Sequence, residues 1–191
     1  MKRVRLELDY IEIQRRRKRW NLYFIIATED PLNPNKTVMT IAPSHTIRLH
    51  PSDDNRIDFE PKGSDDNLNG MSILECEMPQ DFSIKARLWV IQCRDKARDL
   101  GEVLKSISGS AKVDSTVTSL LGGALPWFTV AKSIVAIGGV VGEFFKHSKD
   151  AKKGFVSMDQ SFSKDEQEDG EFDRYNRLVG FGEVGWTWVV E

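Results

Sequence analysis

The side chains that could support catalysis are few, and their spacing does not suit it. His45 and His50 are five residues apart, so on a strand they would face opposite sides and could not share a metal. Ser44 and His45 are neighbours, which on a strand point apart. Cys93 beside Arg94 could be a nucleophile, but a single cysteine at a strand end is more typical of a small core residue. Since no phosphate-binding loop or hydrolase motif is present, the sequence predicts a protein that is not an enzyme.

A run of five cations is the densest charge in the chain: Arg15, Arg16, Arg17, Lys18 and Arg19. Such a run could bind the phosphates of a lipid headgroup or of nucleic acid. A nucleic-acid site usually adds aromatic stacking partners, and only Trp20 adjoins this run, so we expect no nucleic acid. Two interpretations remain. The run is either a solvated hairpin connection that blocks edge pairing, or a site for an anionic membrane surface or an acidic partner.

The composition is that of one globular domain with a full core. The chain has 191 residues, of which 40% are hydrophobic and 29% charged, and its net charge is -2. Two cysteines cannot form a disulfide framework. The start, MKRVRLELDY, shows no apolar segment of a secretory signal, so we expect a cytoplasmic protein, with export by a signal-less route as the alternative.

Strand patterns dominate the sequence outside residues 95–148. Val4–Tyr10 alternates with a period of two, with a bulge expected before Ile11, and Trp20–Thr28 is apolar on both faces, as in a central strand. In Val184–Val190 the alternation places Trp186 and Trp188 on one face. Further short strands are expected at Val38–Ile41, Thr46–Leu49, Ile57–Phe59, Met71–Met78 and Ser83–Gln92. Together they predict a mostly β fold, an antiparallel sandwich over residues 1–191 with a helical insertion at 95–148.

Two helices are expected in this insertion. The first carries an apolar stripe at Leu100, Val103, Leu104 and Ile107. The second, over 127–148, should begin near Trp127 because Pro126 suits a first turn. Its broad apolar face is expected to cover the sandwich: Val130, Ile134, Ile137, Val141, Phe144 and Phe145.

The apolar segment 111–148 also permits a second interpretation. Residues 120–142 are long enough to span a bilayer, and Gly138 and Gly142 have the spacing of a membrane helix pair. Pro126 and Lys132 argue against a constitutive span. The alternative function is therefore a membrane-active or pore-related protein. In either case the candidate contact residues are Trp127, Phe128, Phe144 and Phe145.

The stretch RLWVIQCRDKARDLGEV, residues 87–103, resembles the strand and calcium loop of C2 domains. Cys93 stands at the first aspartate position of that pattern and Asp95 at the second, while residues 99–102 resemble its closing stretch. The resemblance covers the strand-rich parts and implies a C2-like sandwich. It also implies that calcium would be held by Asp53, Asp54, Asp95 and Asp99, with Asp65 and Asp66 as further candidates.

The sulfur of Cys93 is a poor replacement for an oxygen ligand of a hard cation such as Ca²⁺. The sequence Asp-Asp-Asn, at 53–55 and again at 65–67, is typical of turns in which these side chains bond the nearby backbone. We therefore expect a sandwich that has lost its metal and has no cofactor, calcium being the one ion that the resemblance allows. The leading hypothesis is a non-enzymatic binding module, a C2-like sandwich that contacts a protein partner or an anionic membrane surface.

Overall fold

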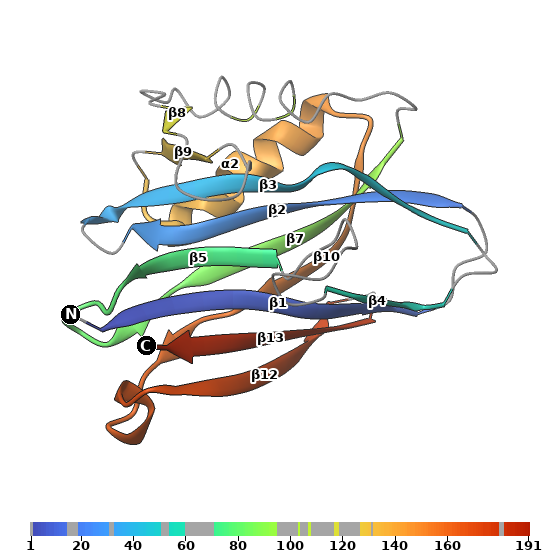
Figure 1. Cartoon of the computed structure of the whole chain (residues 1–191). Coiled ribbons are helices and arrows are strands. Elements are labelled where there is room, and N and C mark those ends of the chain that lie inside the picture. Colours follow the sequence, from blue (N-terminus) through green and yellow to red (C-terminus); the bar gives the residue numbers. More distant parts are fainter. Residues whose placement is uncertain are drawn as a thin grey trace.

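The protein is a three-layer structure of two face-to-face antiparallel sheets and a helical layer (Figure 1). The computed structural model describes residues 2–14, 19–30, 33–50, 54–59, 71–94, 103, 107, 117–118, 127–130, 132–179 and 182–191. The predicted class, a mostly β antiparallel sandwich with a helical insertion, is confirmed.

The first sheet joins the two ends of the chain. Its order is β12 (Gly170–Leu178), β13 (Gly182–Val190), β1 (Arg3–Ile13) and β4 (Arg56–Asp58), and β5 (Met71–Glu77) also pairs with β1. Val4 is opposite Val190 in the β1–β13 pair, and the register shifts between Leu8 and Tyr10. The expected bulge before Ile11 is therefore present, and it returns Ile11 and Ile13 to the buried face.

The second sheet has the order β10 (Ala151–Ser157), β7 (Ala86–Cys93), β2 (Trp20–Asp30), β3 (Asn33–Leu49), β9 (Trp127–Val130) and β8 (Val117–Thr118). Trp20–Thr28 lies within β2, which is an interior strand as predicted.

The two short strands expected at 38–41 and 46–49 are one strand, β3. Its pairing with β2 passes from Ala42 to Ile47, so residues 43–46 bulge at Pro43, which lacks the N–H of a regular ladder. A small ladder of β6 (Ser83–Ile84) and β11 (Gln160–Ser161) and the 3-10 helix η1 (Asp165–Gln167) complete this part.

The main core lies between the two sheets and follows the period-two alternation of the sequence. Trp186 and Trp188, both less than 5% exposed, point into it from β13. Leu88 and Val90 point into the same core from β7, whereas Trp89 belongs to a second cluster on the other side of the sheet. The predicted position of Trp186 and Trp188 on one face of the strand is confirmed.

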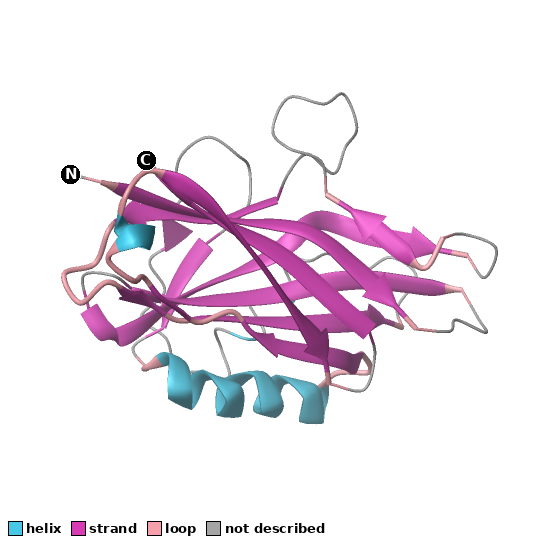
Figure 2. Ribbon diagram, turned by 90° about the horizontal axis from the view of Figure 1, so that it is seen from below, coloured by secondary structure: helices cyan, strands magenta, loops and turns pink. Residues whose placement is uncertain are grey.

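The second cluster lies under helix α2 (Ile134–His147), which covers the outer face of the second sheet (Figure 2). Its buried stripe, at most 2% exposed, is Ile134, Ile137, Val141 and Phe144, as predicted. Val103 and Ile107 are also helical and buried in this cluster, while Leu100 and Leu104 lie outside the described residues.

The prediction that this helix begins near Trp127 is wrong. Residues Trp127–Val130 form strand β9, which pairs with β3 from Thr37 to Thr40. The sequence Trp-Phe-Thr-Val is aromatic and β-branched, and the edge of β3 offers backbone groups with which it can pair. The helix begins only after Ser133. Within the described ranges, no helix is long and apolar enough to cross a membrane.

Candidate functional site

The acidic residues implied by the C2 resemblance do not form a described metal centre. Asp54 is exposed, and its Oδ1 accepts the backbone N–H of Arg56 at 3.3 Å, which is the turn chemistry expected for Asp-Asp-Asn. Asp53, Asp65, Asp66, Asp95 and Asp99 lie outside the described residues. Among the residues that are described, no group of three or more metal-binding side chains occurs.

Both cysteines lack the features of an activated thiol. Cys93 is 3% exposed and packs in the core under α2, as a small apolar residue would. Burial, with Glu75 and Glu77 nearby, raises the pKa of the Cys76 thiol to about 11. At neutral pH that thiol is protonated and is therefore a weak nucleophile.

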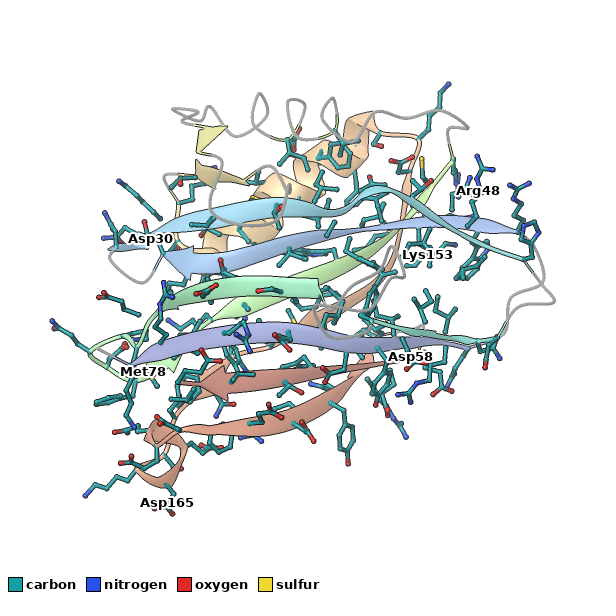
Figure 3. All side chains as sticks on the ribbon, in the orientation of Figure 1. Asp30, Arg48, Asp58, Met78, Lys153 and Asp165 are labelled. Carbon is teal, nitrogen blue, oxygen red and sulfur yellow. The ribbon has the colours of Figure 1, made fainter. Side chains whose placement is uncertain are left out.

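A basic surface lies at one end of the sandwich, where the connection between β1 and β2 enters the second sheet. We call it the basic end and define it by Arg19, Trp20, Arg48 and Lys153. Trp20 is opposite Leu49 and Asn21 opposite Arg48, so Arg48 is a diagonal neighbour of Trp20 whose side chain lies on the other face of the sheet. The Lys153 Nζ, from β10, lies 4.9 Å from the centre of the Trp20 ring. Figure 3 shows Arg48 and Lys153 at the same end of the molecule, with Asp30, Met78 and Asp165 at the other.

No described carboxylate pairs with the cations of the basic end. Ion pairs hold most cations of the first sheet and of the opposite end: Lys2–Glu168, Arg3–Glu75, Arg5–Glu7, Arg56–Asp58, Lys85–Glu29, Arg87–Asp159 and Arg174–Glu166. Arg19, Arg48 and Lys153 have no such partner within the described ranges. Seven other described cations also have none there: Lys36, Arg94, Lys132, Lys149, Lys152, Lys164 and Arg177. The basic end therefore carries three positive charges that no described carboxylate neutralises, although unpaired cations also occur elsewhere.

The run Arg15–Arg19 only partly reveals this surface in the sequence. Arg19 is described and exposed, whereas Arg15, Arg16, Arg17 and Lys18 lie outside the described residues. Arg48 and Lys153 were missed, because they are far from the run in sequence and only strand pairing brings them to the end of the sheet that carries Trp20. The adjacent lysines 152 and 153 were the only hint in the sequence of a cation contributed by this strand. Their place near Trp20 could not be predicted, because it depends on the pairing of β10 with β7.

A shallow cavity of about 250 Å³ adjoins the basic end between α2 and the second sheet. Trp89, Val141 and Phe145 form its apolar wall, and Lys152 and Asp150 lie at its polar side. Asp150 is 7% exposed and accepts hydrogen bonds from the Tyr23 hydroxyl at 2.8 Å and the Arg94 backbone N–H at 3.1 Å. These bonds anchor the start of β10, the strand that carries Lys153.

The predicted aromatic contact residues have different positions. Phe144 is 2% exposed and belongs to the core under α2, so its side chain is not at the surface while α2 is docked on the sheet. Phe145 is half-buried and lines the cavity. Trp127 and Phe128 belong to β9, and their side chains lie outside the described part of the chain.

Comparison with known proteins assigns no family. Neither a protein-family model nor a curated protein matches this chain.

We expect calcium to bind weakly or not at all. Cys93 stands where the C2 resemblance requires a carboxylate, and Ca²⁺ needs six to eight oxygen ligands. Isothermal titration of the full chain should therefore give no submicromolar affinity, and Asp95→Asn should change nothing. A submicromolar affinity that Asp95→Asn abolishes would contradict this prediction.

Proposed function

We propose that the protein is a non-enzymatic binding module with a C2-like sandwich, which contacts an anionic membrane surface through the basic end. One observation carries the proposal: Arg19, Arg48 and Lys153 lie at the end of the second sheet that carries Trp20, without a carboxylate partner among the described residues.

Several properties of the basic end support a membrane surface as the partner. Arg48 comes from β3 and Lys153 from β10, and Arg19 directly precedes β2, so paired strands of the second sheet hold the cations in place. Trp20 is half-buried, and an amphipathic indole suits the headgroup level of a bilayer. The run Arg15–Lys18 adds four charges directly before Arg19 in the sequence. Each cation near an anionic bilayer contributes roughly 1 kcal/mol to binding.

Vesicle flotation of the full chain tests the proposal. The wild type should float with phosphatidylserine-containing vesicles, not with neutral ones, and independently of calcium. Binding should weaken as salt is raised, because these contacts are electrostatic. Since the double substitution Arg48→Glu/Lys153→Glu removes two cations, we expect apparent affinity to fall by at least about 30-fold.

A matched control separates a local site from net charge. Lys36→Glu/Lys164→Glu changes the charge by the same amount at two exposed positions away from the basic end. It should retain nearly all of the binding. Equal loss in both double variants would refute a defined site. Failure of the wild type to float, with retained binding to an acidic peptide, would identify a protein partner instead.

A further inference from the structure

The exposed face of the first sheet holds a hydroxyl between two carboxylates. The Thr187 Oγ1 lies 2.9 Å from the Asp9 Oδ2 and 2.9 Å from the Asp173 Oδ1. The three residues belong to three adjacent strands: β13 in the middle, β1 on one side and β12 on the other. Thr187 is 8% exposed.

One hydroxyl proton cannot satisfy both acceptors. A threonine hydroxyl has a single O–H to donate, and an ionised carboxylate can only accept. If both aspartates were ionised, one carboxylate would meet the lone pairs of Oγ1 at hydrogen-bond distance. Both negative charges would also lie close to each other across that one group. A proton on either carboxyl removes the conflict, because the protonated carboxyl then donates to Oγ1 while Oγ1 donates to the other.

We propose that Asp9 and Asp173 hold one proton between them through Thr187, and that this arrangement makes the attachment of edge strand β12 sensitive to pH. We call these three residues the carboxyl clasp. No partner or cofactor is needed, since water supplies and takes up the proton.

The surroundings of Asp9 favour the protonated form. Burial is the largest effect that raises its pKa, and the charges of Asp173 on β12 and Glu7 on β1 raise the pKa further. The Thr187 hydrogen bond and Arg56 on β4 act in the opposite direction, but the pKa of Asp9 is raised overall. Arg5 pairs with Glu7 at 2.6 Å and Arg56 with Asp58 at 2.5 Å, so the nearest cations are shared with other carboxylates. On β12, Glu171 and Tyr175 are the neighbours on the same face as Asp173.

The sign of the pH dependence follows from the raised pKa. The folded protein binds this proton more tightly than the unfolded chain, in which an aspartate has its ordinary pKa of 3.8. The stabilising contribution of the clasp is therefore complete below 3.8 and is lost as pH rises through the folded pKa. β12 should accordingly be held more tightly to β13 in mild acid than at neutral pH.

Carbon-detected NMR titration of the aspartate carboxyl groups in the full chain tests the shared proton directly. Asp9 should titrate above the ordinary value of 3.8. Asp173→Asn should move the Asp9 titration to lower pH, because it removes the neighbouring charge. Glu171→Gln removes the same charge from the same face of β12 and should leave the Asp9 titration unchanged. An Asp9 titration that Asp173→Asn does not move would overturn the proposal.

Thermal unfolding gives a second readout, because an asparagine amide donates to Oγ1 as a protonated carboxyl does. At pH 7 Asp9→Asn should raise the Tm by about 2–4 °C over the wild type, and the difference should disappear near pH 4. Glu171→Gln should follow the wild-type dependence on pH. An Asp9→Asn profile parallel to the wild type at every pH would show that the clasp has no effect on stability.

Discussion

Replacing Ile137 with aspartate should lower the free energy of unfolding by about 2.5–6 kcal/mol. Ile137 is fully buried between α2 and the second sheet. The substitution removes an apolar side chain whose burial contributes roughly 1.5–3 kcal/mol. It also places a carboxyl group in an apolar cluster, which adds a desolvation penalty of about 1–3 kcal/mol or more. Urea unfolding followed by tryptophan fluorescence measures the change.

Val135→Asp is the matched control, since Val135 lies on the same helix but is 81% exposed. That variant should unfold within about 0.5 kcal/mol of the wild type. The pair also distinguishes the two interpretations of the apolar segment 111–148. If Ile137→Asp left stability unchanged but abolished the leakage that the protein causes in liposomes, α2 would be a membrane element. The conformation in which it packs on the sheet would then not be the functional one.

Replacing Gly182 with alanine should destabilise the fold by about 3 kcal/mol, at the upper end of overpacking effects. A Cβ at this position would lie 1.8 Å from the carbonyl oxygen of Glu12 and 2.8 Å from its carbonyl carbon. Both atoms are backbone, and Gly182 is the partner of Ile13 where β13 begins to pair with β1. No side-chain rotation can relieve the clash, so the ladder between the first and last strands must shift.

Gly139→Ala provides the opposite expectation within the same chain. Gly139 lies in α2, and a Cβ there would meet nothing within 4 Å. Because alanine is the better helix former, this variant should gain about 1 kcal/mol. Chemical denaturation of both variants should thus give shifts of opposite sign. A neutral Gly182→Ala would mean that the β1–β13 ladder is looser at this end than the structure indicates.

Much of the fold could be predicted from local patterns. The alternation in Val4–Leu8 and Val184–Val190 identified which side chains face the core, because a strand places every second residue on the same side. The spacing of Ile134, Ile137, Val141 and Phe144 identified the buried face of α2 for the corresponding reason in a helix. These properties depend on residues a few positions apart, so the sequence contains them.

Contacts between distant segments could not be predicted in this way. Residues Trp127–Val130 were expected to be helical, and only the available edge of β3 makes them a strand. The basic end depends on β10 and β3 bringing Lys153 and Arg48 to the end of the sheet that carries Trp20, although the three are scattered along the chain. The carboxyl clasp likewise requires β13 to lie between β1 and β12. Backbone pairing depends little on side-chain identity, so the choice of neighbouring strands is made by the packing of the whole core.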